Sequence, residues 1–328
     1  MEWTDDVSAG DWLRERLDDP WRGTMHDVVP RGFDAYARVF HPTTRSRPVG
    51  RPWPPFPQER HHREWDAFAA SAPEIETVEA RWQDAATAFG TTLHPLAQWG
   101  ALVRTTDGAP GDVRSAVSSE GWEFDPPRPG ELDADTLARV LSHLVGDASS
   151  PGFSAVWAGW GGLLGHMGIA PSRVALREPD DDPAQDRLRR TLEQSIIDPF
   201  NRPYATQTWH AGLLPDDVSR GTLLSLPNRE HVLFEGDLRV FTDADWPDAV
   251  PWADPDPGGA GFEPVAQSPA LLWPAARTWV LVTDVDQDST VVGGPASVIA
   301  GLCADPGIEA LPIPADADLR WDADEVNR

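Results

Sequence analysis

The sequence predicts an α+β fold, with a mixed or antiparallel sheet and packed helices, and three observations carry this prediction. Residues 133–146 place apolar side chains at the spacing of an amphipathic helix. Residues 278–285 (TWVLVTDV) form an apolar, β-branched run that is typical of a buried strand. Predicted helices and strands intermix without a regular βαβ alternation, which favours an α+β fold over a doubly wound parallel sheet.

The first predicted elements are a helix over residues 11–17 and a strand over residues 33–40 (FDAYARVF). Residues 45–63 follow, with five prolines between Pro48 and Pro57. Because proline at this density is excluded from helix and sheet interiors, we expect an extended, polyproline-like loop there.

In the middle of the chain, the sequence predicts two helices and a strand. Residues 76–90 carry apolar residues on one helical face and end at Gly90, a residue favoured just after a helix. Residues 96–105 have the composition of a strand. The helix over residues 133–146 is expected to begin after Asp133, whose carboxylate can accept from free backbone N–H groups.

The second half predicts a buried strand at residues 153–158, an acidic, proline-broken linker at 177–186 and a helix over about 186–197. The remaining predicted elements are strands over 222–226, 231–235, 238–242, 278–285 and 308–313, a loop over 243–261 and a helix over 295–304. We expect one unit over residues 1–328, with 1–176 and 187–328 as candidate subdomains.

The chain is strongly acidic, with 27 basic and 53 acidic residues and a formal net charge of −26. Binding to nucleic acid or to an anionic membrane surface relies on an excess of Lys and Arg, so we expect neither. Residues 153–170 lack formal charge but contain five glycines, which favours a strand and a turn over a membrane span. The N-terminal segment lacks the basic and apolar regions of a signal peptide, and we expect a soluble, cytoplasmic protein.

The absence of lysine excludes several reaction classes. All 27 basic residues are arginines, so the chain has no Walker A lysine, no kinase-type Lys–Glu pair and no Schiff-base nucleophile. Cys303 is the only cysteine, which excludes an intrachain disulfide and a thiolate metal cage. We predict no cofactor other than a divalent cation.

An alternation of acids predicts where that cation would bind. Asp284, Asp286 and Asp288 follow the apolar strand at 278–285, and alternation in an extended segment would place all three carboxylates on one side. The spacing resembles the start of an EF-hand calcium loop, but Ser289 and Pro295 stand where that loop needs Gly and Glu, which excludes an EF-hand. The alternative is a solvated strand end without a metal.

Gly293 and Gly294 precede the helix predicted at 295–304, and free backbone N–H groups at such a helix start can hold an anion. The alternative is that the two glycines only turn the chain. With the three aspartates, this corner would combine a metal and a phosphate site.

Residues 45–63 predict a partner-binding surface. Five arginines accompany the prolines there, in contrast to the acidic chain, and Arg51, Trp53 and Phe56 have the side chains that anchor protein interfaces. The alternative is that the arginines pair with acids of the same chain and that the aromatic rings pack inward.

Several segments resemble a family of uncharacterised proteins common in actinobacterial genomes. They are GFDAYARVFHP (32–42), PRPGELDADTLARVLSHL (127–144), FSAVWAGWG (153–161), QSPALLWPAARTWVLVTDVDQDSTVVGG (267–294) and the terminal DADEVN. The resemblance implies one family unit across both halves of the chain, and it implies no activity, cofactor or site residue. The family pattern W-P-x-D-R is broken here, since Ala275 or Ala276 stands at the aspartate position.

The sequence therefore leads to two functional hypotheses. The first is a non-enzymatic protein-binding protein that uses Arg51, Trp53 and Phe56 on its proline-rich loop. The alternative is a metal-dependent hydrolase or phosphate-handling enzyme that uses Asp284 and its two neighbouring aspartates.

Overall fold

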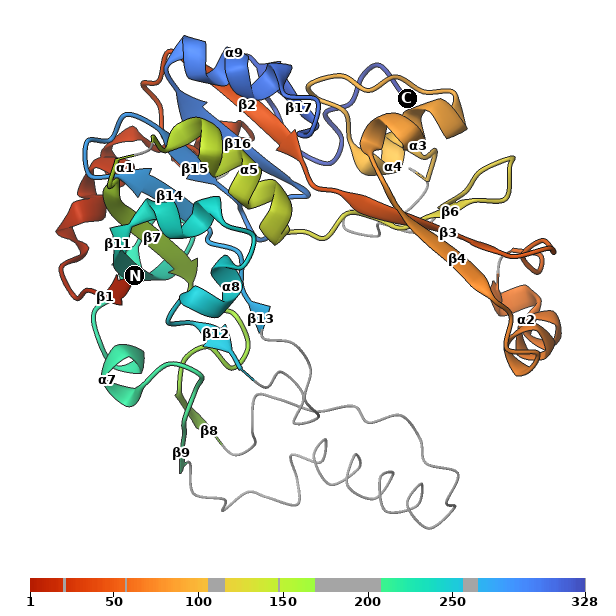
Figure 1. Ribbon diagram of the computed structural model, residues 1–328, viewed down its shortest axis with the longest axis horizontal. Helices are drawn as coiled ribbons and strands as arrows, with labels where there is room; N and C mark the ends of the chain where they lie inside the picture. Colours follow the sequence, from red (N-terminus) through yellow and green to blue (C-terminus); the bar gives the residue numbers. More distant parts are fainter. Residues whose placement is uncertain are drawn as a thin grey trace.

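The computed structural model describes residues 1–19, 22–56, 58–105, 116–146, 148–168, 208–255 and 265–327, and it confirms the α+β class (Figure 1). The strand pairings in these ranges are antiparallel, including those of the longest strands. None of the helices in these ranges reaches the length and hydrophobicity needed to span a bilayer.

A nine-stranded antiparallel sheet forms the centre of the molecule, in the order β1–β11–β7–β14–β15–β16–β2–β17, with β10 also paired to β11. Its strands are β1 (Glu2–Trp3), β2 (Ala35–Phe40), β7 (Pro151–Trp157), β10 (Leu224–Ser225), β11 (Glu230–Asp237), β14 (Leu271–Pro274), β15 (Val280–Val282), β16 (Ser289–Gly294) and β17 (Ala310–Ile313). Strands β14, β15 and β16 are buried along their whole length, as expected where both faces of a sheet are covered.

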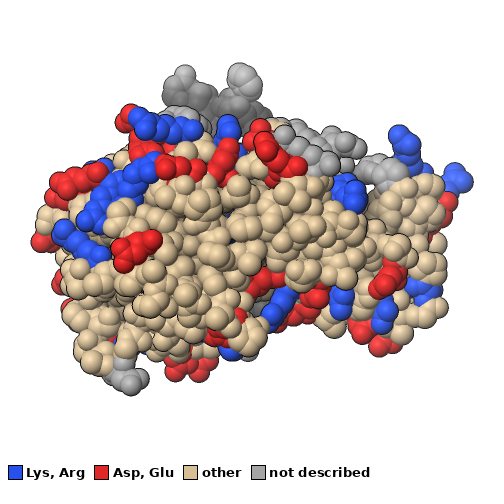
Figure 2. All heavy atoms as spheres, turned by 90° about the horizontal axis from the view of Figure 1, so that it is seen from above, with Lys and Arg blue, Asp and Glu red and all other residues tan. Residues whose placement is uncertain are grey.

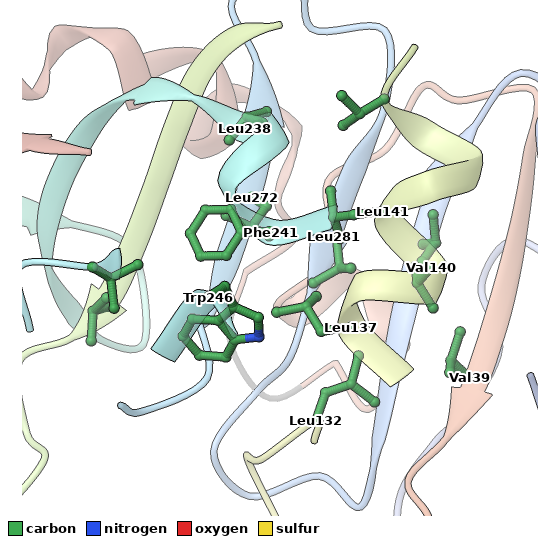
Figure 3. Close-up of a cluster of buried hydrophobic side chains, with 14 of the residues drawn as sticks. Val39, Leu132, Leu137, Val140, Leu141, Leu238, Phe241, Trp246, Leu272 and Leu281 are labelled. Carbon is green, nitrogen blue, oxygen red and sulfur yellow. The ribbon is translucent and has the colours of Figure 1, made fainter. Parts of the chain in front are cut away.

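One face of this sheet is covered by α5 (Ala134–Leu144), α9 (Ala296–Ala304), the 3-10 helix η4 (Leu238–Thr242) and α8 (Trp246–Ala249). Figure 3 shows Leu137 and Leu141 of α5 beside Phe241, Trp246 and Leu281, which form part of one buried cluster. These side chains are removed from water almost completely, and this burial is the main stabilising term of the fold.

The opposite face is covered by the two ends of the chain. The covering elements are η1 (Val7–Gly10), α1 (Asp11–Arg16), η2 (Met25–Asp27) and the segment that follows β17. Trp12, Met25 and Leu319 belong there to a second buried cluster, in which Trp12 meets Trp273 of β14 edge to face. We refer to the central sheet with its two covering layers as the body.

A second sheet extends from the body, in the order β4–β3–β6–β5. Its strands are β3 (Thr43–Pro48), β4 (Ile75–Ala80), β5 (Ala116–Val117) and β6 (Glu123–Phe124). Only His41 and Pro42 separate β2 from β3, so one continuous stretch of chain enters both sheets. The helices α3 (Trp82–Phe89) and α4 (Trp99–Leu102) form its core together with Phe40.

The remaining elements are η3 (Gln58–Arg60), α2 (His62–Ala70), β8 (His166–Gly168), β9 (Thr208–His210), α7 (Asp216–Ser219), β12 (Ala253–Asp254) and β13 (Val265–Ala266). Strand β8 pairs with β9, and β12 pairs with β13. The helix α2 lies at the far end of the β3–β4 hairpin, away from the body (Figure 1).

Most of the predicted elements are present. Those at 11–17, 33–40, 133–146, 153–158, 222–226, 231–235, 295–304 and 308–313 are confirmed as α1, β2, α5, β7, β10, β11, α9 and β17. The cap of α5 is also confirmed, because the Asp133 carboxylate accepts from the Thr136 backbone N–H at 2.9 Å.

The prediction of one helix over residues 76–90 is wrong, because the segment is divided into β4 and α3. Val78 and Trp82 are four residues apart, which suits a helix, but Val78 belongs to a strand paired residue by residue with β3. The stop at Gly90 is correct, since this residue follows α3 with a left-handed φ of 65°.

Two other predicted strands are helical. Within residues 96–105 the chain forms α4, and residues 238–242 form η4, which Asp237 caps by accepting from the Arg239 backbone N–H at 3.1 Å. Short apolar runs do not distinguish a buried strand from a buried helical turn, and packing decides between them.

Two loop predictions are also corrected. The predicted extended loop at 45–63 begins as strand β3, continues through η3 and ends in the first turn of α2. The described part of the loop predicted at 243–261 contains α8 and β12.

The linker predicted at 177–186 and the helix predicted at 186–197 lie outside the described residues. Strands from 1–176 and from 187–328 alternate in the central sheet, where β7 lies between β11 and β14. The sheet therefore does not divide into the two candidate subdomains.

Candidate functional site

A hairpin that projects from the second sheet brings the predicted partner-binding residues together. We call residues 43–80 the arm: they comprise β3, the proline-rich segment with η3, helix α2 and strand β4. Strands β3 and β4 pair over six positions, from Thr43 with Ala80 to Pro48 with Ile75. The antiparallel pairing carries the segment between them to the far end of the molecule (Figure 1).

Four aromatic rings form a cluster at the tip of the arm. Trp53 stacks on Trp65 of α2 with ring centroids 5.9 Å apart and lies 5.6 Å from Phe68. Phe56 meets Trp65 edge to face at 5.2 Å. The indole N–H of Trp65 donates to the Pro55 backbone carbonyl at 3.1 Å, which joins the helix to the proline-rich segment.

The helical part of this cluster was missed from the sequence. Trp65 and Phe68 are three residues apart, a spacing that places both on one face of a helix. That signal was available, but the extended loop is predicted only to residue 63, and no element is predicted for Trp65 and Phe68.

Arg51 is attached to the same cluster. Its guanidinium lies 4.5 Å from the centroid of the Phe68 ring and donates to the Ser71 hydroxyl at 2.6 Å. Nearer the body, Arg47 lies over Trp122 at 4.2 Å and donates to Glu76 at 2.8 Å. These two arginines therefore use contacts within the same chain.

The tip of the arm is not covered by the rest of the described chain. No residue of α2 is buried. Six large apolar side chains are exposed among the described residues, and three of them, Val49 (50% exposed), Phe56 (46%) and Ile75 (38%), belong to the arm. The cluster thus packs on itself, neither inward against the body nor as separate solvated rings.

The arm differs in charge from the rest of the chain. It contains five arginines and six acidic residues, so it is close to neutral on a chain of net charge −26. The positive charge predicted for residues 45–63 is balanced by acids of α2 and β4. Figure 2 shows charges of both signs together at the arm's end of the molecule, on the right.

The three aspartates of the predicted metal site lie in a turn and not in an extended strand. Strand β15 ends at Val282 and β16 begins at Ser289, so Asp284, Asp286 and Asp288 belong to the connection between them. The prediction that alternation places all three on one side is wrong, because the chain reverses direction there.

Each of these aspartates meets an arginine. Arg229, from the turn between β10 and β11, donates through Nε to Asp284 at 3.2 Å and also binds Asp286 through a terminal nitrogen. Asp288 pairs with Arg38 of β2 at 3.2 Å instead. A guanidinium therefore lies where the proposed cation would bind Asp284 and Asp286.

The two arginines differ in their surroundings. Burial would lower the pKa of Arg229, but the Asp284 and Asp286 carboxylates outweigh burial and raise the pKa. Arg38 is fully buried, and desolvation lowers the pKa of its guanidinium despite Asp288. Its Nη1 also donates to the Ala97 backbone carbonyl at 2.7 Å, which joins the body to the second sheet.

Within the described ranges, no three His, Cys, Asp or Glu side chains are arranged so that they could hold a metal ion together. The predicted anion site is corrected as well. Gly293 and Gly294 belong to β16 and pair with β2, so they do not form a loop before α9. A Cβ on Gly293 would lie 2.8 Å from Phe33, so this glycine allows close packing between the strand and its covering layer.

A cavity of about 390 Å³ lies beside the acidic turn. Its walls come from η2, the β10–β11 turn, the β15–β16 turn and the C-terminal segment, and they include Asp27, Arg229 and Asp284. The sequence did not indicate this cavity, because its walls are contributed by four segments far apart along the chain.

Comparison with protein-family models, with curated proteins and with solved structures finds no match to this chain. Functional inference therefore depends on the arm, the acidic turn and the cavity themselves.

Proposed function

We propose that this chain is a non-enzymatic protein-binding protein and that the tip of its arm contacts the partner. The observation that carries the proposal is the uncovered aromatic cluster of Trp53, Phe56, Trp65 and Phe68. Aromatic side chains dominate the binding energy of many protein interfaces, because they bury a large area with few rotatable bonds.

The geometry of the arm supports this role. Trp53 and Trp65 hold each other in place, so little side-chain freedom remains to be lost on binding. Phe56 is the most exposed ring of the cluster and is available as the anchor. Charged residues of both signs flank the cluster along the chain, and Arg63, Glu64 and Asp66 of α2 are exposed, as in the polar rim of an interface.

A crosslinking experiment tests the proposal directly. A photoreactive benzoyl-phenylalanine replaces Phe56 in one variant and Trp321 in the control, because Trp321 is also aromatic and is 58% exposed, but lies outside the arm. Both variants are irradiated in lysate of the source cells. We expect a protein crosslinked only from position 56, and we expect excess unlabelled wild-type chain to compete it away.

The identified partner is then titrated against the purified chain. The double variant Trp53→Ala, Phe56→Ala should bind at least about 30-fold more weakly, a loss of about 2 kcal/mol, while Trp321→Ala should bind like the wild type. The same crosslinks from both positions, or unchanged affinity of the folded double variant, would overturn the proposal.

A further inference from the structure

Strand β4 forms one side of the arm, and in the described chain no further strand lies beyond it. The order of the second sheet places β4 at an edge, and Figure 1 shows β3 between β4 and β6. Strand β4 is six residues long and contains no proline. Since an edge strand presents unpaired N–H and C=O groups, its outer side is a template for pairing with another strand.

The pairing with β3 determines which backbone groups of β4 face outward. The Val49 backbone N–H donates to the Glu74 carbonyl at 3.0 Å, so these two residues form a hydrogen-bonded pair just beyond the strands. Hydrogen-bonded and non-hydrogen-bonded pairs alternate along an antiparallel ladder. The N–H and C=O groups of Ile75, Thr77 and Glu79 therefore point away from β3.

Two residues of β3 support this assignment. Thr44, opposite Glu79, uses its carbonyl on the other side of β3, where it accepts from the Asp125 backbone N–H at 2.9 Å. Pro48, opposite Ile75, has no N–H to donate across the hairpin. Within the described residues, no hydrogen bond reaches the outward backbone groups of β4.

The other edges of the two larger sheets are shorter or interrupted within the described residues. Strands β1, β5 and β10 have two residues each, and the four-residue β17 contains Pro312. The opposite side of the arm passes beyond β6 and ends at Pro48. Short or proline-containing edges resist pairing with another chain, whereas β4 keeps all of its outward donors.

The side chains of β4 indicate what kind of strand would fit. Residues 74–79 contain three glutamates and no basic residue. Glu76 pairs with Arg47 at 2.8 Å, whereas Glu74 and Glu79 form no ion pair with another described residue. Ile75 is 38% exposed beside them. A strand with basic side chains opposite the glutamates and an apolar side chain opposite Ile75 would complement this edge.

A second copy of this chain does not have these properties. Its own β4 would bring three more glutamates to the same edge, and each chain has a net charge of −26. Like charges across a pair of strands destabilise the pairing. The same negative charge attracts a basic segment.

We propose that the outer edge of β4 binds an extended, basic segment of a partner protein as a fifth strand of the second sheet. Main-chain hydrogen bonds hold the segment, and the glutamates select its basic side chains. This inference rests on the proposed protein-binding function, but it concerns the side of the arm and not its tip.

The experiment uses the acetylated and amidated peptide RVTRVR as the probe. In antiparallel pairing this peptide places an arginine opposite each of the three glutamates and a valine opposite Ile75. One control peptide carries N-methyl groups on its four central residues, which keeps the charges and blocks main-chain pairing from either side. The other control is EVTEVE. Each peptide is titrated by calorimetry in about 0.15 M salt, which screens long-range attraction between charges.

Two matched variants of the chain differ in the backbone at position 77. Thr77→Pro removes an outward N–H and leaves the bonds to β3, whereas Thr77→Ala keeps this N–H. Both variants lose the contact of the Thr77 hydroxyl with Ser46. We expect RVTRVR to bind the wild type and Thr77→Ala with a dissociation constant below about 1 mM. Thr77→Pro, or the N-methylated peptide, should weaken binding at least about 10-fold, and EVTEVE should not bind.

If Thr77→Pro does not fold, amide hydrogen exchange of the wild type replaces that comparison. In the free chain the Thr77 and Glu79 amides should exchange quickly, because they face outward. RVTRVR at about 10 mM should slow both at least about threefold, while the Glu76 and Val78 amides, which face β3, should change little. Unchanged exchange at Thr77 would overturn the proposal.

Two calorimetric results would also overturn it. Equal binding of RVTRVR and its N-methylated form would show only attraction to an acidic surface, and absence of binding up to about 10 mM would show that the edge accepts no such strand. In either case a protein crosslinked from position 56 would keep the function proposed for the tip. Conversely, the double variant Trp53→Ala, Phe56→Ala should bind RVTRVR like the wild type, so peptide binding without that crosslink would refute the tip alone.

Discussion

The body and the arm use the same aromatic residues in opposite ways. In the body, Trp246, Trp252 and Trp273 are each at most 2% exposed and pack within large apolar clusters. In the arm, Trp53 and Trp65 contact one another and two phenylalanines at the end of a hairpin, where no residue of α2 is buried. The residue type alone therefore does not decide whether a tryptophan lies in the core. Trp53 and Trp65 lie outside the core because the β3–β4 hairpin carries them away from the body.

The largest expected effect is in the body. Trp246→Ala should lower the free energy of unfolding by about 3–5 kcal/mol, because it removes a buried ring from contact with Phe241 and leaves a cavity. Trp53→Ala in the arm should cost no more than about 1 kcal/mol, since it loosens only the tip. Urea denaturation measures both. Similar losses in the free energy of unfolding for the two variants would show that the arm unfolds together with the body. The contrast between body and arm would then be wrong.

The success of sequence-based prediction follows the same division. The helix at 133–146 was predictable because it has one strong period and a cap at Asp133. The strands at 33–40 and 153–158 were predictable because each is a short, mainly apolar run. Residues 76–80 were not, because their pairing with β3 depends on where the hairpin turns, and no local signal marks that point.

The sites divide in a similar way. Arg51, Trp53 and Phe56 are close in sequence, and their composition alone led to the prediction of an interaction surface. The pairing of Asp284 with Arg229, and a cavity whose lining includes both Asp27 and His231, depend on segments more than 50 residues apart, which only the folded sheet brings together.

The pH dependence of stability should come from the body. The pKa of His231 is about 4 in the folded chain, below its ordinary value of 6.5. Between these two pH values the unfolded chain binds a proton that the folded chain does not, so the free energy of unfolding falls as the pH falls from 6.5 towards 4. His231 contributes about 3 kcal/mol to the free energy of unfolding over this range. Above pH 6.5 the ring is neutral in both states, so His231 causes no further change in stability with pH.

Urea titrations at several pH values, carried out on the wild type and on His231→Phe, isolate this contribution. The variant should lose stability less steeply between pH 6.5 and pH 4, because it has no proton to bind at this position. Equal slopes for the two proteins would show that His231 is not held neutral by burial.

In the arm, replacing Phe56 should have a small effect on stability and a larger effect on partner binding. Phe56→Ala should change the free energy of unfolding by less than about 0.5 kcal/mol, because the ring is 46% exposed and, among the described aromatic rings, contacts only Trp65. The same variant should weaken partner binding severalfold. A loss of stability comparable to that of Trp53→Ala would mean that Phe56 serves the tip of the arm and not a partner.

The smallest expected change in stability tests whether Asp284 and Asp286 bind the Arg229 guanidinium or a metal ion. The Asp286 side chain is 75% exposed, so its ion pair with Arg229 is mostly screened by water. Asp286→Ala should therefore change stability by no more than about 0.5 kcal/mol, and this difference should be the same with calcium, with manganese and with EDTA. The reason is that the Arg229 guanidinium already lies between Asp284 and Asp286, and a cation would first have to displace it.

Native mass spectrometry before and after EDTA gives the second measurement. The opposite result would be a mass increase of one divalent ion that EDTA removes, together with a metal-dependent gain in thermal midpoint, both of them lost in Asp286→Ala. That result would show that a metal ion displaces Arg229 and would restore the enzymatic hypothesis.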